Sequence, residues 1–171
     1  MKLNNFFVMS ATAFAMTSGS VYAADEALAD AIWSGVIGGS VPSSNLIITG
    51  EAGGDIQQGS LYVNTDGTFT SSNVILEARD FTPEDQTVGD RQPEATWTYV
   101  TSQVLMGSQV TQDANVEVYN DQQKLDQGSV GSATGGYVQL NVKNTNPVTD
   151  VAVEGEAQVI VQMAASYVAA L

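Results

Sequence analysis

Gly155-Glu-Ala-Gln-Val-Ile-Val-Gln-Met-Ala-Ala-Ser-Tyr167 is the stretch of sequence that decides the fold. Its small and apolar residues occupy one parity and its polar residues the other, with Ile160 and Ala164 as the exceptions. A repeat of two predicts a β-strand with one face on a core and the other in water. At about 3.3 Å per residue the segment extends roughly 40 Å, about twice the usual strand length. The inward positions are Ala157, Val159, Val161, Met163, Ala165 and Tyr167.

Short apolar or β-branched runs recur along the rest of the chain and are separated by turn residues. The runs that we expect to form strands are 45–49, 60–64, 68–71, 72–79, 96–106, 115–119, 122–125 and 137–143. Asp66-Gly67 lies between two such runs, 60–64 and 68–71, and predicts a hairpin. We expect residues 72–79 to extend the second strand of this hairpin. The proline-containing stretch 81–93 and the Gly/Ser-rich stretch 128–136 are predicted loops. About seven strands, no evident helix and no internal linker predict one antiparallel β-sandwich domain.

The first 23 residues have the organisation of a secretory signal peptide. Lys2 supplies the early positive charge, an apolar segment spans 6–16, and Val21 and Ala23 lie where a signal peptidase reads small residues. About 11 apolar residues are too few to cross a bilayer, which needs around 20. We therefore expect an exported protein that begins at Ala24 after cleavage.

Cleavage at this point would remove 23 of 171 residues and leave 148, with four Lys and Arg against 19 Asp and Glu, a net charge of −15. Such a charge argues against nucleic acid and anionic lipid as partners and favours solubility. A chain of this length can bury a core without covalent links, and it contains no cysteine. The predicted fold therefore uses no disulfide.

Catalysis is not expected, because the sequence lacks both histidine and cysteine. These absences exclude a Ser-His-Asp triad, a thiol nucleophile and the commonest metal ligands. Asp80, Glu84 and Asp85 crowd one predicted loop and are the remaining candidates for a Ca²⁺ site or for paired-carboxylate chemistry. Surface exposure is the ordinary state of acidic residues in such a loop, so we predict neither a metal site nor a cofactor.

Residues 24–33, Ala-Asp-Glu-Ala-Leu-Ala-Asp-Ala-Ile-Trp, admit three interpretations: a strand, an amphipathic helix or a disordered tail. As a strand, the odd register presents Ala27, Ala29, Ala31 and Trp33 on one face. The even register would place Asp30 on the same face as Leu28 and Ile32, where an unpaired carboxylate is costly. The odd register is therefore favoured, although alanines provide less burial energy than Leu28.

The two ends of the chain together resemble chaperone–usher pilin subunits, in particular their cysteine-less branch. The resemblance lies in Gly155 followed by alternating apolar residues up to Tyr167, and in Ala31-Ile-Trp33-Ser34 early in the predicted mature chain. It implies an immunoglobulin-like sandwich that lacks one strand, formed by residues 35–171 and preceded by an N-terminal extension, 24–34.

In this family the extension of one subunit completes the sheet of the next, and a periplasmic chaperone fills the same place beforehand. The resemblance implies that Ala27, Ala29, Ala31 and Trp33 are the donated residues. It implies that the acceptor and chaperone surface is the C-terminal strand, with Gly155, Ala157, Val159, Val161, Met163, Ala165 and Tyr167. The expected partners are other subunits of the same kind, the chaperone and an outer-membrane usher. The expected location is a fimbria on the cell surface, and the expected role of this fibre is to support adhesion.

A second hypothesis is a secreted β-sandwich that binds a carbohydrate or a host receptor, for example as a minor tip subunit. Trp97, Tyr99 and Tyr119 would then stack on a sugar ring if they were exposed. Aromatic residues in a sandwich more often fill its core, which is the alternative for these three.

Overall fold

The computed structural model describes residues 25–33, 39–107, 109–111, 114–148 and 156–167. Within these residues the chain consists of antiparallel strands and one short 3-10 turn, η1 (Glu51–Gly53). The prediction of an all-β antiparallel sandwich is confirmed. The predicted signal peptide, residues 1–23, and the predicted first mature residue, Ala24, lie outside the described residues.

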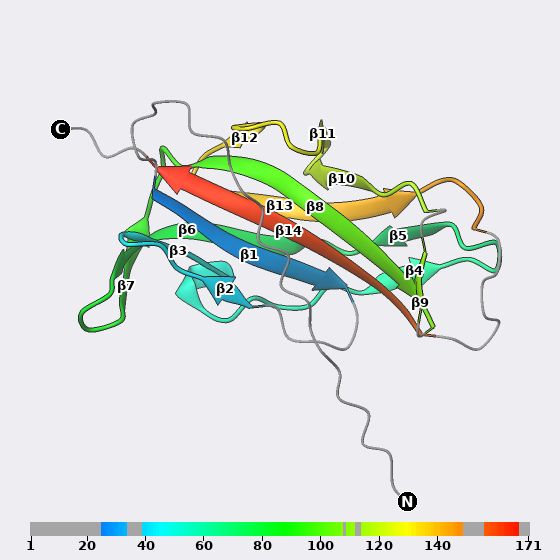
Figure 1. The fold of residues 1–171 in the computed structure, drawn as a ribbon, viewed down its shortest axis with the longest axis horizontal. Helices are drawn as coiled ribbons and strands as arrows, with labels where there is room; N and C mark the ends of the chain where they lie inside the picture. The colour runs from blue at the N-terminus through cyan, green and yellow to red at the C-terminus, as the bar shows by residue number, and fades with distance from the viewer. Residues whose placement is uncertain (1–24, 34–38, 108, 112–113, 149–155, 168–171) are drawn as a thin grey trace, which may run out of the picture.

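The strands form two sheets that face each other (Figure 1). The first sheet has the order β12 (Ala133–Thr134), β8 (Thr96–Met106), β14 (Ala157–Tyr167), β1 (Asp25–Trp33) and β2 (Ser40–Val41), and β9 (Gln109–Thr111) also pairs with β8. The second has the order β11 (Gln123–Leu125), β10 (Glu117–Asn120), β13 (Tyr137–Asn144), β5 (Phe69–Ser71) and β4 (Leu61–Val63). In the second sheet β6 (Val74–Thr82) pairs with β13, with β3 (Leu46–Thr49) and with β7 (Thr87–Arg91).

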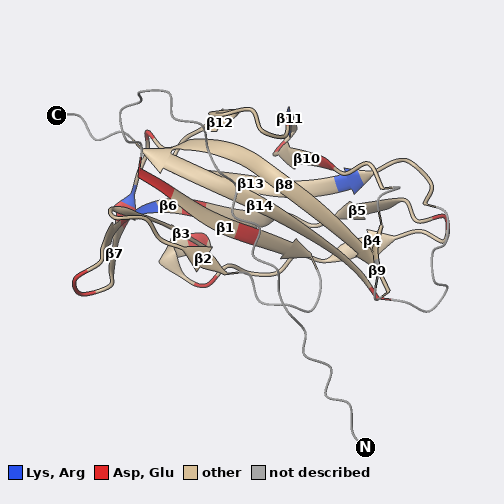
Figure 2. Cartoon of the chain, viewed as in Figure 1, with Lys and Arg blue, Asp and Glu red and all other residues tan. Residues whose placement is uncertain are grey.

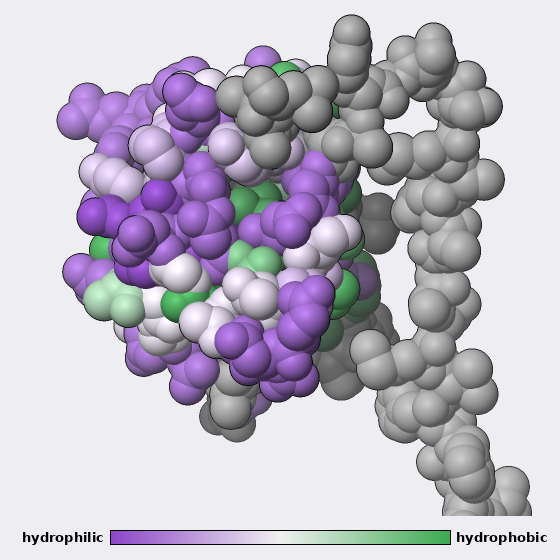
Figure 3. Space-filling model, turned by 90° about the vertical axis from the view of Figure 1, so that its left-hand side faces the viewer, coloured by the Kyte–Doolittle hydropathy of each residue, from purple (hydrophilic) through white to green (hydrophobic). Residues whose placement is uncertain are grey.

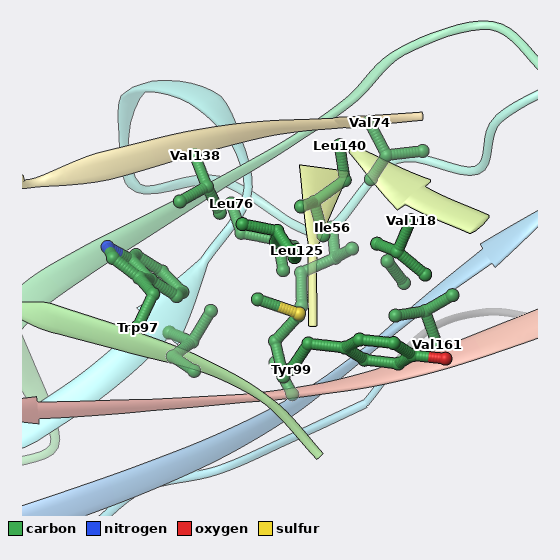
Figure 4. Packing of buried hydrophobic residues seen from close by; sticks show 14 of the residues in the cluster. Ile56, Val74, Leu76, Trp97, Tyr99, Val118, Leu125, Val138, Leu140 and Val161 are labelled. Carbon is green, nitrogen blue, oxygen red and sulfur yellow. The ribbon is translucent and has the colours of Figure 1, made fainter. Parts of the chain in front are cut away.

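The core lies between the two sheets and is filled from both sides (Figure 4). Trp97 of β8 and Val161 of β14 point from the first sheet, and Leu76 of β6 and Val138 of β13 point from the second. All four side chains are fully buried. The buried positions alternate along β13 and along the two ends of β8, as expected where one face of a strand packs and the other meets solvent.

The prediction of a loop over 81–93 is wrong. β6 continues to Thr82 and β7 returns from Thr87, with Phe81 opposite Val88 across the hairpin. Pro83 lies in the turn and Pro93 follows the end of β7, so neither removes a backbone donor from the strand pair. The two prolines therefore delimit the hairpin, whereas the sequence analysis took them as evidence against strands.

The expectation that 72–79 extends the second arm of the predicted hairpin is correct. β5 and β6 lie consecutively along β13, with Thr70 opposite Lys143 and Val74 opposite Leu140. The described residues contain fourteen strands where the sequence predicted about seven, because short edge segments such as β2, β9 and β12 add to the long ones. Such short strands carry too few residues for a repeat of two to be visible.

One buried ion cluster joins β6, β7 and η1. The carboxylate of Glu77, which is 4% exposed, accepts hydrogen bonds from Arg79 Nε at 2.7 Å and from the Gly53 amide at 3.3 Å. Arg91 Nη1 lies 3.6 Å from the other carboxylate oxygen, and Arg79 Nη1 donates to the Gly89 carbonyl at 3.0 Å. Both arginines of the chain are therefore used to neutralise one buried glutamate.

The basic and acidic residues are unevenly placed on the sandwich. Figure 2 shows Lys and Arg near the β6–β7 end and on β13, whereas Asp and Glu are scattered over strands and turns. The end of the sandwich nearest to β7 is mostly hydrophilic (Figure 3). Of the helices in the described segments, none is long and apolar enough to span a bilayer.

Replacing Glu77 by Ala should destabilise the sandwich by about 3–5 kcal/mol, because Arg79 would be left largely buried without its counter-ion. Urea unfolding followed by circular dichroism measures this loss. The matched control is Glu117→Ala, which removes a carboxylate from the solvent-exposed pair with Lys124 and should change the midpoint little. Equal effects of the two substitutions would contradict a special role for the buried cluster.

Candidate functional site

The first and last described strands pair along their whole common length. β1 and β14 are antiparallel neighbours, in register from Asp25 opposite Tyr167 to Trp33 opposite Val159. In Figure 1 they appear as adjacent blue and red arrows, with β8 on the far side of β14. The segment expected as an N-terminal extension is thus a strand of the chain's own first sheet.

The odd register of β1 is the one the structure adopts. Ala27, Ala31 and Trp33 are completely buried and Ala29 is 3% exposed, so the strand interpretation is correct and the helical one is not. Asp30 lies on the opposite face, which is the reason given above for preferring this register. Ile32 is also buried, although it belongs to the even set.

The facing strand presents its expected residues to the same core. Val159, Val161, Met163 and Ala165 of β14 are fully buried, and the core cluster also contacts the partly buried side chains of Ala157 and Tyr167. Ala164 is buried as well, although it has the opposite parity. Gly155, the remaining residue of the predicted acceptor set, lies outside the described residues.

Trp33 anchors the C-terminal end of β1 in a tight slot. Its indole Nε1–H donates to the Ser72 carbonyl at 2.9 Å, and the Gly59 amide donates to the Ile32 carbonyl at 3.1 Å. A Cβ at position 59 would lie 2.0 Å from Trp33 Cδ1, so only glycine leaves room for the ring. The slot therefore requires a large flat side chain on β1 and no side chain opposite it.

Asp25 anchors the other end of β1. Its two carboxylate oxygens accept hydrogen bonds from the successive amides of Ser44, at 3.0 Å, and Asn45, at 2.5 Å. A carboxylate held by two backbone donors is a charge-assisted contact that is stronger than a neutral hydrogen bond. Local sequence patterns do not reveal Asp25, Gly59 or Ser72, because their roles arise from contacts between segments far apart in the chain.

These two anchors determine the register of β1. Ala27, Ala29 and Ala31 are identical in size, so a slip of two residues would still place alanine in most of the alanine sites. The same slip would move Trp33 into an alanine site, or in the other direction move Asp25 into the core and leave the tryptophan slot unfilled. Both outcomes are costly, since one overpacks the core and the other buries a charge and opens a cavity.

Asp30 and Glu26 are the titratable groups on the outer face of β1, and Asp30 lies directly opposite Gln162 of β14. Partial burial raises the pKa of its carboxyl group above the usual value, and a hydrogen bond with the Gln162 side chain acts in the opposite direction. Asp30 thus links β1 to β14 on the side of the sheet that faces away from the core.

The other candidates from the sequence lie apart from this pair of strands. Asp80 accepts a hydrogen bond from Gln92 and Asp85 accepts one from the Thr87 amide. Among the described residues no group of three acidic side chains is arranged to hold a metal ion.

The aromatic residues considered for sugar stacking are largely internal. Trp97 is fully buried and donates its indole N–H to the Gly135 carbonyl at 2.8 Å, and Tyr99 is 4% exposed. Tyr119 is partly buried, with its hydroxyl donating to Glu117 at 3.0 Å. Trp97 and Tyr99 therefore belong to the core, and the stacking hypothesis is wrong for them.

Comparison of the chain with protein-family models, with curated proteins and with solved structures finds no match. Its functional assignment therefore depends on the geometry of β1 and β14 and on the sequence resemblance described above.

Replacing Gly59 by Ala should displace the Trp33 ring from its slot and loosen β1, because the added methyl group would overlap the indole. In ¹⁵N-labelled protein we expect the Trp33 indole N–H resonance to shift and to exchange faster with solvent. Gly39→Ala is the control, since a Cβ there meets nothing within 4 Å. An unchanged Trp33 resonance in the Gly59 variant would contradict the tight packing of the indole ring against position 59.

Proposed function

We propose that this protein is the subunit of a surface fibre of the chaperone–usher type, in which β1 of one copy occupies the place beside β14 of the next. The observation that supports the proposal is that β1 supplies an entire buried row of the core and pairs with β14 over its whole length.

Removal of β1 would leave two unsatisfied features in the first sheet. One is the edge of β14, whose backbone donors and acceptors face β1 over nine residue pairs. The other is the apolar surface that Ala27, Ala29, Ala31 and Trp33 cover. An open sheet edge beside an apolar groove recruits any strand of matching pattern, as in strand addition between chains.

In the isolated chain, β1 fills its own sheet, and in the proposed fibre an identical strand from a neighbour makes the same contacts. Because donor and acceptor surfaces lie on different parts of each subunit, every added copy leaves one of each free. Such a head-to-tail contact does not close, and it generates a filament. A chaperone that lends a temporary strand would keep the acceptor edge open until assembly.

The charge of the chain is compatible with this role. The predicted mature chain carries a net charge of −15. Like-charged subunits repel one another outside the specific contact, which opposes unspecific association of a protein built from edge strands. Strand exchange would then be the favoured route to assembly.

Deleting 24–34 should abolish polymerisation, since the truncated subunit would have an acceptor edge and no donor. Co-expression with the chaperone keeps the truncated subunit soluble, and electron microscopy together with size-exclusion chromatography reports fibres. A labelled synthetic peptide of residues 24–34 should bind the truncated subunit, and the same peptide with Trp33→Ala should bind at least about tenfold more weakly. Fibres formed by the truncated protein would refute the proposal.

Replacing Tyr167 by Ser should reduce the amount of subunit that accumulates in the periplasm with its chaperone. Tyr167 lies at the end of β14 opposite Asp25 and packs against the core, so its loss weakens the proposed chaperone-binding edge. Immunoblotting of periplasmic extracts measures the yield. Tyr62→Ser is the matched control, because Tyr62 is 60% exposed on β4, and normal yield of the Tyr167 variant would contradict the assignment.

A further inference from the structure

A cleft of about 620 Å³ opens beside the first sheet, away from the anchors of β1. It is lined by residues of β1, β8, β9 and β14, by residues 114–116 and by Gln127. Its volume lies within the range of roughly 300–1,000 Å³ that is typical of small-molecule sites. The strand exchange proposed above would replace only its Asp30, by the same residue of a neighbouring copy.

The lining is rich in uncharged hydrogen-bonding side chains. Thr101 and Gln103 of β8 and Asn115 are exposed in the cleft, and Gln162 of β14 lies beside Asp30. Among the described residues, the side chains of Thr101, Gln103 and Asn115 form no hydrogen bond with the protein. Amide and hydroxyl groups that both donate and accept are therefore available to a ligand.

The charge of the lining selects against anionic ligands. Among the described residues that line it there is no lysine or arginine, and Asp30 is the only carboxylate. Partial burial raises the pKa of Asp30, and its carboxylate can accept hydrogen bonds from adjacent hydroxyl groups of a ligand. A phosphate, sulfate or sialic acid would find no counter-charge and would be repelled by Asp30.

The cleft also has an apolar strip. Ile160 of β14 and Val110 of β9 contribute to its wall, and Val110 is 44% exposed. Sugar rings present C–H groups on one face and hydroxyl groups around the edge. A strip of aliphatic side chains bordered by amides and hydroxyls is complementary to that arrangement.

We propose that this cleft binds a neutral oligosaccharide, with Thr101, Gln103 and Asn115 contacting its hydroxyl groups. The ring faces would lie on Ile160 and Val110. This assignment differs from the stacking hypothesis of the sequence analysis, because the site needs no exposed aromatic side chain. Tyr99 borders the cleft, but its hydroxyl donates to Ser102 Oγ at 2.5 Å and its ring is held in the core.

The cleft can be tested independently of assembly, since it is present in the isolated chain. If fibres form as proposed, Asp30 would come from the neighbouring subunit, and each junction would carry one complete site. This last point alone rests on the proposed function. Failure of polymerisation would leave the isolated cleft and its binding test unaffected.

The test is titration of ¹⁵N-labelled full-length chain with maltotriose, mannotriose, lactose and N,N′-diacetylchitobiose, each compared with sialyllactose. We expect at least one neutral sugar to shift the side-chain amide resonances of Gln103, Asn115 and Gln162. The double variant Thr101→Ala with Gln103→Ala should weaken that binding at least about tenfold, through the loss of two hydrogen-bonding groups. Gln57→Ala, in an exposed loop outside the cleft, is the control and should bind normally.

Three results would overturn the proposal. The first is the absence of shifts with all four neutral sugars at millimolar concentration. The second is binding that the double variant retains at full strength, which would place the sugar elsewhere. The third is tighter binding of sialyllactose than of lactose, which would contradict the charge argument. Both substituted residues are exposed, so the variants should fold and keep the outcome interpretable.

Discussion

The pairing of β1 with β14 is the contact on which the rest of the structure depends. β14 is the central long strand of the first sheet, with β8 on one side and β1 on the other. The pair buries the row from Ala27 to Trp33 against the row from Val159 to Ala165. Without it, the core between the sheets would be open along one side and a long strand edge would be unpaired.

The middle and the ends of β1 have different roles: the middle packs against the core, and the ends fix the register. Small alanines in the middle let the strand lie close to the opposite sheet, but they carry little information about register. That information is supplied by Trp33 in its slot and by the carboxylate of Asp25 on two backbone amides. In the proposed fibre, these two anchors would admit an identical strand from a neighbour and few others.

The fold class and the long strands could be predicted from the sequence, because alternation over many residues is a strong signal. β14, β8 and β13 were all found in this way, as was the inward parity of β1.

The β6–β7 hairpin was missed, since Pro83 and its acidic neighbours also suit a loop. Gly59 and Asp25 could not be found from local patterns, because the Trp33 slot joins residues 26 positions apart and the Asp25 contact joins residues about 20 apart. The cleft was likewise invisible, as it combines residues of four strands.

The absence of a side chain at position 59 has an evolutionary corollary. Since the indole of residue 33 fills the volume that a Cβ at position 59 would need, position 59 can gain a side chain only if residue 33 also changes. Within the proposed fibre they would belong to different molecules, so a population carrying a compensated pair would no longer mix with the parental one. A single glycine would then decide which of two otherwise similar subunits can be incorporated into the same filament.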